Sequence, residues 1–231
     1  MSMPFGYVPP EQLTKDRADY ARKGIARGRP LVVLEYEGGI AFVSENPSAL
    51  LHKVAELYDR IAFAAVGRFS QFENLRQAGV RLADIRGYSY GREDVTSRAI
   101  ANFFSQTLAQ IFSAEPWPYE VELCVAEVGS DGAPNALYNV DYDGTVTDPK
   151  GVLAMGAQAE ELSAELQRGY QDGMSLDDAV RLAVRALRKL APPGESSSRL
   201  EVAVLERGAA RRSFRRLSEQ DVAAWTAQPG S

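Results

Sequence analysis

The chain has 231 residues, of which 45% are hydrophobic and 25% are charged, as in ordinary globular proteins. Its net charge of −5 argues against nucleic acid as the default partner. The sequence has no long uncharged apolar run, so no membrane-spanning helix is expected, and residues 1–24 lack the basic start and apolar core of a signal peptide. We therefore expect a cytoplasmic chain without a membrane partner.

Cysteine and histidine are too scarce for several kinds of site. The single cysteine, Cys124, excludes an internal disulfide framework and fits a reducing compartment, and its apolar neighbours predict a buried thiol. The only histidine, His52, cannot form a two-histidine zinc site, and it would be the only base available to a Ser-His-Asp triad. No phosphate-binding glycine loop is present, and no cofactor is expected.

One stretch matches part of a calcium-binding loop. Asn139, Asp141, Asp143 and Gly144 fit four positions of an EF-hand loop, but the twelfth position, which should hold a bidentate glutamate, is Lys150. A cation cannot replace that ligand. The stretch therefore predicts a hairpin turn and no metal site.

The N-terminal region divides at the proline pair that begins with Pro9. Proline is favoured at the first helical positions, so a helix is expected over 10–26, preceded by a flexible tip, 1–9, that carries Phe5 and Tyr7. The helix is heavily charged and lacks a wide apolar stripe, so it needs a neighbouring element or subunit to pack against. Its few apolar positions are Leu13, Tyr20, Ala21 and Ile25.

A β-hairpin follows this helix. Two apolar runs, Leu31–Tyr36 and Ile40–Val43, flank Gly38-Gly39, and a Gly-Gly pair between such runs predicts a two-residue turn with positive φ angles. After a strand at Ile61–Val66, apolar residues recur every three or four positions, which predicts two helices. These helices are expected over Arg68–Arg86 and Glu93–Phe112.

The second half of the chain repeats this order of strands and helices. Strands are expected at 118–129 and 151–157, and in a hairpin with a primed turn at Asp143-Gly144. Two helices come next, the second capped by Ser175. The expected helices are Glu160–Tyr170, Leu176–Leu190 and Ser218–Trp225, and the last strands are Leu200–Leu205 and Ala210–Arg216.

The order of elements predicts the fold class. Helices come in consecutive pairs and most strands come as hairpins, unlike the alternation of strand and helix that produces a parallel sheet. This order predicts an α+β sandwich of antiparallel sheets covered by paired helices. No linker divides the sequence, so a single domain is expected over 10–231.

Several stretches resemble subunits of the proteasome core particle, which have the N-terminal-nucleophile hydrolase fold, and in particular the α-type subunits of actinobacteria. The resemblance covers nearly the whole chain and implies a four-layer αββα sandwich with an extra N-terminal helix. It rests on “DYARKGIARGR” (19–29), “GGIAFVSENPS” (38–48), “HKVAELYDRIAFAAVGRF” (52–69), “FENLRQAGVRLADIRGYSYGREDVTSR” (72–98), “PYEVELCVAEV” (118–128) and “YDGTVTDPKGVLAMG” (142–156).

The resemblance also implies that this chain lacks the family's nucleophile. In catalytic β-type subunits, an N-terminal threonine enters the first strand and supplies both a hydroxyl and an amine. The aligned residue here is Arg29, whose guanidinium offers no nucleophile, and Pro30 indicates an uncut connection. Glu45 stands where β-type subunits have an aspartate, and Lys53 matches their activating lysine. We therefore expect a non-catalytic subunit.

As an α-type subunit, the chain is expected to form a seven-membered ring with copies of itself and to stack on β subunits. The resemblance implies a pocket between neighbouring subunits where Lys53, with Gly67 and Asp19, binds the C-terminal carboxylate of a ring-shaped AAA ATPase. Without the resemblance, Lys53 would be interpreted as a solvated charge ahead of a strand.

The resemblance gives the N-terminal tip a role as well. In the family, the tips of the ring subunits converge on the pore axis and close it. Segment 1–9 is suited to such a gate through Phe5, Tyr7 and the hinge at Pro9.

Two other functions stay open from the sequence. A catalytic threonine-type peptidase of the same fold would need a freed Thr, Ser or Cys at the start of a strand, and none precedes Leu31. An adaptor could bind acidic partners through arginines, such as those of “RRSFRR” (211–216), and would be a monomer that ignores β-type subunits.

Overall fold

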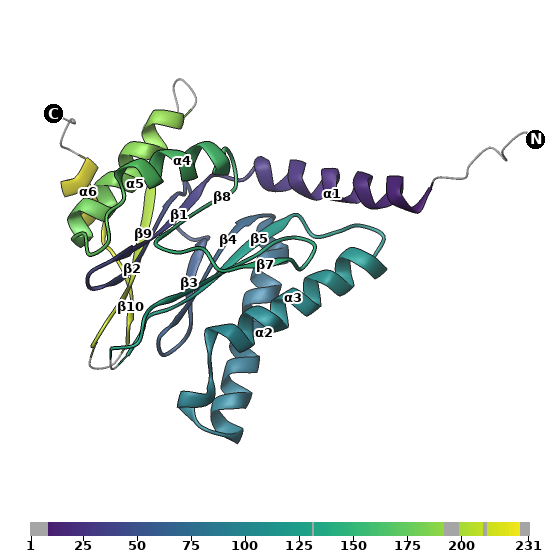
Figure 1. Cartoon of the computed structure of the whole chain (residues 1–231), viewed down its shortest axis with the longest axis horizontal. Coiled ribbons are helices and arrows are strands. Elements are labelled where there is room, and N and C mark those ends of the chain that lie inside the picture. The colour runs from purple at the N-terminus through teal and green to yellow at the C-terminus, as the bar shows by residue number, and fades with distance from the viewer. Residues whose placement is uncertain (1–8, 131, 192–198, 210–211, 227–231) are drawn as a thin grey trace, which may run out of the picture.

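The fold is built around two antiparallel β-sheets of five strands each, which face one another (Figure 1). The computed structural model describes residues 9–130, 132–191, 199–209 and 212–226. The first sheet has the strand order β10-β9-β2-β1-β8, and the second has the order β3-β4-β5-β6-β7. The strands are β1 (Leu31–Tyr36), β2 (Gly39–Glu45), β3 (Val54–Tyr58), β4 (Ile61–Gly67), β5 (Val121–Glu127), β6 (Ala136–Val140), β7 (Val146–Thr147), β8 (Val152–Met155), β9 (Leu200–Glu206) and β10 (Phe214–Arg216).

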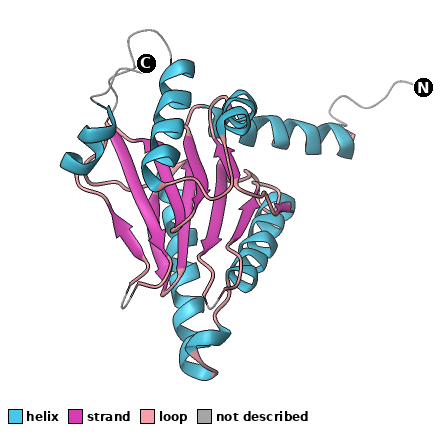
Figure 2. Cartoon of the chain, turned by 60° about the vertical axis from the view of Figure 1, so that its left-hand side comes forward, coloured by secondary structure: helices cyan, strands magenta, loops and turns pink. Residues whose placement is uncertain are grey.

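Paired helices cover the outer faces of both sheets (Figures 1 and 2). α4 and α5 pack on the first sheet, whereas α2 and α3 pack on the second. This arrangement confirms the predicted four-layer α+β sandwich. None of the described helices is long and apolar enough to cross a membrane. The helices are α1 (Pro10–Ala26), α2 (Phe69–Ser89), α3 (Ser97–Ala114), α4 (Ala159–Gly169), α5 (Leu176–Leu190) and α6 (Glu219–Thr226), with a short 3-10 helix at Arg92–Asp94.

Three apolar clusters hold the four layers together. Alternate side chains of a strand point to opposite faces of its sheet. On β1, Leu31 and Val33 lie between the two sheets, whereas Val32 and Leu34 face α4 and α5. The third cluster joins the second sheet to α2 and α3 around Phe104. Each interface is therefore a continuous buried surface that the hydrophobic effect stabilises.

α1 projects away from this sandwich (Figure 1). Its buried residues, Ala21 and Ile25, lie near its C-terminal end and join the cluster between the sheets. Leu13, near the other end, is 50% exposed. Most of this helix is therefore left uncovered by the described part of its own chain, as its charged sequence predicts.

The turn between β1 and β2 differs from the prediction. Tyr36 pairs with Gly39, so the turn residues are Glu37 and Gly38 rather than Gly38 and Gly39. Of the three residues 37–39, only Gly39 has a positive φ, at 151°. A Cβ at Gly39 would lie 1.9 Å from the Leu205 carbonyl oxygen. Glycine is thus required there by the close approach of β9 and not by a primed turn.

The turn after β6 was also predicted with the wrong geometry. Gly144 has a φ of 87°, but Asp143 does not have a positive φ, so the pair does not form a primed turn. The Gly144 N–H donates instead to the Asp141 carbonyl oxygen at 2.9 Å.

One strand and the start of one helix differ from the prediction as well. The prediction missed β3 (Val54–Tyr58), an edge strand that pairs only with β4 in the described structure. α3 begins at Ser97 rather than at Glu93, because Thr96 caps it by accepting a hydrogen bond from the Ala99 N–H at 3.3 Å.

Candidate functional site

Arg29 lies in the link between α1 and β1, where the resemblance places a nucleophile. Its guanidinium Nη1 donates to Glu45 Oε2 at 3.4 Å, and the Glu45 side chain is only 6% exposed. Glu45 is the last residue of β2, so the first hairpin of the fold positions both partners. The position therefore holds an ion pair, and the guanidinium provides no nucleophilic atom.

Lys53 completes this cluster. Its Nζ donates to the carbonyl oxygen of Arg29 at 2.6 Å. Burial lowers the pKa of the Lys53 amine from 10.5 to about 8, although the carboxylates of Glu201 and Glu45 oppose this shift. The amine is therefore still mostly an ammonium at neutral pH. The structure thus brings together Arg29, Glu45 and Lys53.

Gly67 lies beside the same link. It ends β4 with a φ of 105°, and a Cβ there would lie 1.9 Å from the Glu120 carbonyl oxygen, so only glycine fits. A Cβ on Gly28 would in turn lie 3.0 Å from the Gly67 nitrogen. Because Gly28 precedes Arg29, whose carbonyl Lys53 contacts, Gly67 and Lys53 flank one segment of backbone.

Asp19 occupies a different environment, on α1. Its carboxylate lies 3.9 Å from the Arg22 guanidinium of the same helix, and its side chain is 47% exposed. No contact between Asp19 and Lys53 or Gly67 is found among the described residues, so the three do not converge within one chain.

The expected gate residues lie mostly beyond the described part of the chain. Phe5 and Tyr7 are outside the described residues. Pro9 is exposed and extended ahead of α1, with a φ of −58° and a ψ of 144°. Its carbonyl oxygen accepts a hydrogen bond from the Leu13 N–H at 3.1 Å, which fixes where the helix begins.

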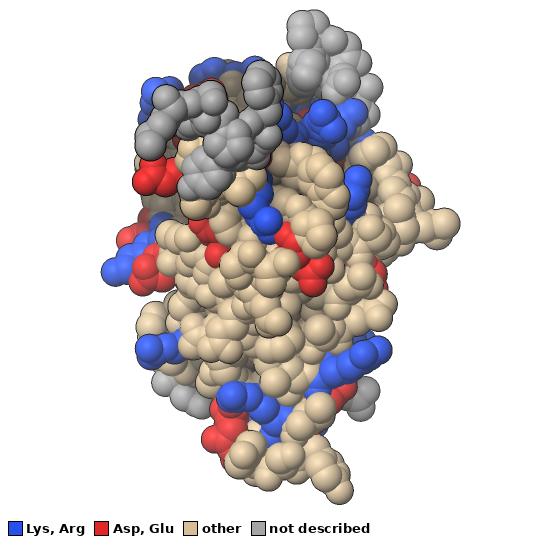
Figure 3. Space-filling view, turned by 90° about the vertical axis from the view of Figure 1, so that its right-hand side faces the viewer, with Lys and Arg blue, Asp and Glu red and all other residues tan. Residues whose placement is uncertain are grey.

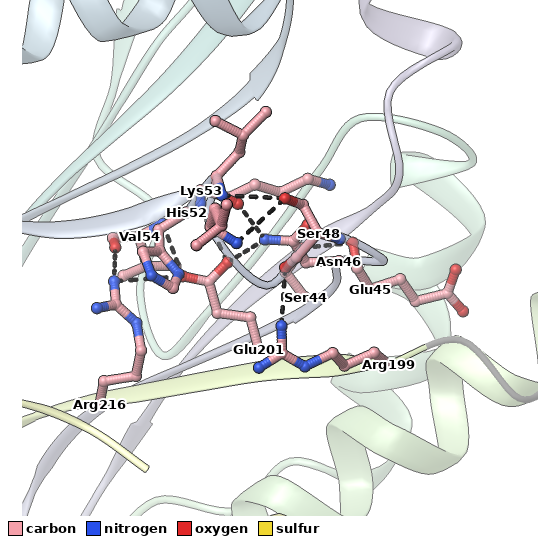
Figure 4. A network of polar contacts seen from close by, with 12 residues as sticks. Ser44, Glu45, Asn46, Ser48, His52, Lys53, Val54, Arg199, Glu201 and Arg216 are labelled. Atoms are coloured by element: carbon pink, nitrogen blue, oxygen red, sulfur yellow. Dashed lines mark hydrogen bonds and ion pairs between the residues drawn. The ribbon is translucent and has the colours of Figure 1, made fainter. Parts of the chain in front are cut away.

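The sequence analysis missed one residue of the site, Glu201. Its side chain is 5% exposed, and it accepts a hydrogen bond from the backbone N–H of Lys53 at 3.0 Å (Figure 4). The sequence does show a glutamate within the apolar strand Leu200–Leu205, and a carboxylate that is buried in such a strand needs several hydrogen-bond or ionic partners. Its partners are distant in sequence, so they could not be found there.

A hollow of about 300 Å³ opens beside the Arg29–Glu45 pair. Arg27 and Gln158 lie on its polar side, and the helices α4 and α5 supply an apolar wall. Among the described residues, no group of three or more His, Cys, Asp or Glu side chains could hold a metal ion. The arrangement can bind anionic groups through its cations, but it lacks the hydroxyl and amine of a threonine peptidase. The apolar wall consists of Leu162, Leu187, Leu190 and Ala191.

Comparison with known proteins identifies the family. A family model described as Proteasome subunit matches residues 25–205. A protein of Kineococcus radiotolerans named Proteasome subunit alpha is 56% identical over 231 residues, which cover 94% of this chain and 95% of that protein. Proteins of the same name from Frankia casuarinae and Frankia alni are 53% and 50% identical, over 94% and 99% of this chain and 94% and 98% of their own lengths. The chain therefore belongs to the proteasome subunit family, as a non-catalytic subunit of the α type.

Proposed function

We propose that this chain assembles with other proteasome subunits into the outer rings of a cytoplasmic core particle, where it gates the entry of substrates and binds a ring-shaped AAA ATPase. The observation that carries this proposal is the cluster of Arg29, Glu45 and Lys53. An ion pair and a partly buried lysine stand at the position where related subunits cut peptides. A role in binding is what these side chains support.

Lys53 is the proposed anchor for the C-terminal carboxylate of the ATPase. An ammonium has three donors, and the Arg29 carbonyl takes one of them. A charge that is partly removed from water binds a carboxylate more strongly than a fully solvated one does. Gly67 has no side chain to keep the incoming backbone away, and Asp19 forms the acidic edge of the pocket at the interface between two copies.

The surface of the chain supports packing in a ring. α1 buries little of itself against its own chain, and Leu13 stays exposed. The face toward which α1 projects has a wide area below its centre without Lys, Arg, Asp or Glu side chains (Figure 3). Depletion of charge is typical of the centre of a protein–protein interface. In the ring, the tips ahead of Pro9 are expected to form the gate, with Phe5 and Tyr7 at the pore.

The test uses the full chain assembled with the β-type subunit of the same genome, and it measures binding of the ring-shaped AAA ATPase. Lys53→Ala is expected to weaken binding by about tenfold or more, because the bound carboxylate loses its cation. Lys189→Ala is the matched control, since that lysine pairs with Glu165 on the surface and should leave binding unchanged. Binding of wild-type strength in Lys53→Ala would exclude the proposed anchor.

A further inference from the structure

A buried carboxylate connects the two sheets next to the proposed docking lysine. Glu201 belongs to β9 of the first sheet, where it lies opposite Ser44 of β2. Its side chain is 5% exposed and leaves its own sheet to reach the segment that begins β3 in the other (Figure 4). A carboxylate removed from water in this way is costly unless each oxygen finds donors or cations.

Both oxygens of Glu201 find such partners. Oε2 accepts hydrogen bonds from Asn46 Nδ2 at 2.7 Å and from the Lys53 N–H at 3.0 Å. The partners of Oε1 are the Val54 N–H at 3.4 Å, His52 Nδ1 at 3.3 Å and Arg216 Nη2 at 3.4 Å. Five groups therefore surround one carboxylate, and four of them belong to residues 46–54.

The loop before Lys53 is folded around one of these partners. Asn46 Nδ2 also donates to the Leu51 carbonyl oxygen at 2.7 Å, and Asn46 Oδ1 accepts from the Ser48 N–H at 3.0 Å. Arg199 closes the outer side by donating to the Ser48 carbonyl oxygen at 2.9 Å. Glu201 thus holds the amide that shapes the loop, as well as the backbone at the end of the loop.

The same carboxylate acts on the side chain of Lys53. Burial and the neighbouring Arg29 guanidinium lower the pKa of the Lys53 amine, whereas Glu201 and Glu45 raise it. Among these charges, Glu201 has the largest effect on the amine. The charge and the hydrogen bonds of Glu201 therefore both bear on Lys53.

We infer that Glu201 is the positioning residue of the docking site: it fixes the backbone from which the Lys53 side chain leaves and supplies a buried negative charge that favours the ammonium. This inference rests on the docking role proposed for Lys53. The competing interpretation is that Glu201 only joins the two sheets and matters for stability alone. The two interpretations differ in what they predict for the titration of Lys53.

The first measurement is the pKa of Lys53 by NMR, with ¹³C-methylated lysines in the full chain. The chain has five lysines, and the Lys53 signal is identified by its loss in Lys53→Ala. In Glu201→Gln, the pKa should fall by about one unit, because the opposing charge is removed while the shape is kept. Glu165→Gln, which removes a surface carboxylate paired with Lys189, is the control and should leave the signal unchanged. An unchanged pKa in folded Glu201→Gln would overturn the inference.

The second measurement is binding of the ring-shaped AAA ATPase to the assembled particle. Glu201→Gln should weaken binding about tenfold, and Glu201→Asp, which keeps the charge but is one methylene shorter, should lose less. Glu201→Asp also serves if Glu201→Gln does not fold, and wild-type binding in Glu201→Asp would contradict the need for the full reach of the side chain. If Lys53→Ala binds normally, the docking role fails, whereas the NMR titration still decides whether Glu201 controls Lys53.

Discussion

The ammonium of Lys53 donates a 2.6 Å hydrogen bond to the carbonyl oxygen of Arg29. This contact joins the residue that precedes β3 to the link between α1 and β1. In the catalytic members of the family, a lysine at this position serves a threonine. Here Lys53 is held by the backbone of Arg29, which the resemblance aligns with that threonine, next to the Arg29–Glu45 ion pair.

Restoring the hydroxyl alone should not restore catalysis. In Arg29→Thr a hydroxyl would stand on the residue whose carbonyl oxygen Lys53 contacts, but its amine would stay in a peptide bond with Gly28, so the general base of a threonine peptidase would be missing. We expect no peptide hydrolysis above that of the wild-type chain. Fluorogenic peptide assays measure the activity, and intact mass measures cleavage. Hydrolysis together with loss of residues 1–28 would contradict this prediction.

The affinity for the ATPase should depend on pH through Lys53. The pKa of its amine is lowered to about 8, so the charged form dominates at pH 7 and is lost as the pH rises through 8. A carboxylate binds only the charged form well, so affinity should be constant near pH 6–7 and fall above about pH 8. Binding measured across this range gives the profile.

Lys53→Arg provides the control for that profile. A guanidinium stays charged throughout the range, so any binding that this variant retains should not fall above pH 8. A fall of the same size in Lys53→Arg would show that another group titrates.

Glu122 should make the stability of the chain depend on pH. It is half-buried on β5, where its carboxylate accepts hydrogen bonds from Asn139 Nδ2 at 3.0 Å and from the Gly156 N–H at 3.2 Å. Burial raises the pKa of Glu122 to about 7, with a further contribution from Asp141, despite these two hydrogen bonds. The folded chain therefore binds a proton here between about pH 4.5 and 7 that the unfolded chain has released.

The sign of the effect follows from this difference. The contribution of protonated Glu122 to stability is complete below about pH 4.5 and is lost as the pH rises through 7. Glu122→Gln stays neutral at every pH, so it carries no charge that must be accommodated as the pH rises. The free energy of unfolding of Glu122→Gln relative to wild type should therefore increase by about 1–3 kcal/mol between pH 4.5 and pH 8.

Urea denaturation at several pH values measures this difference. Glu160→Gln is the matched control, since Glu160 is exposed at the start of α4 and its substitution should give a difference that changes little with pH. A difference between Glu122→Gln and wild type that is the same at pH 4.5 and pH 8 would show that Glu122 is ionised in the folded chain throughout.

Local signals in the sequence predicted most of the elements. Ser175 was expected to cap a helix, and its hydroxyl accepts a hydrogen bond from the Asp178 N–H at 3.2 Å. The apolar run Leu31–Tyr36 predicted a strand, and β1 has the same bounds. β3 was missed because its polarity does not alternate clearly and its pairing with β4 includes a bulge between Glu56 and Tyr58.

The site was harder to predict because its contacts are distant in sequence. Lys53 was found only through the resemblance, since nothing in its neighbours indicates that its ammonium reaches Arg29. Glu201 was missed because most of the partners of its carboxylate lie about 150 residues earlier in the chain. Asp19 presents a further difficulty, since the pocket proposed for it needs a second copy of the chain.

The most direct test of this account is native mass spectrometry of the chain co-expressed with the β-type subunit of the same genome. The account predicts one particle that contains both chains, with the mass of four stacked seven-membered rings. A chain that stays at its monomer mass of 25.3 kDa in the presence of the β-type subunit would contradict it.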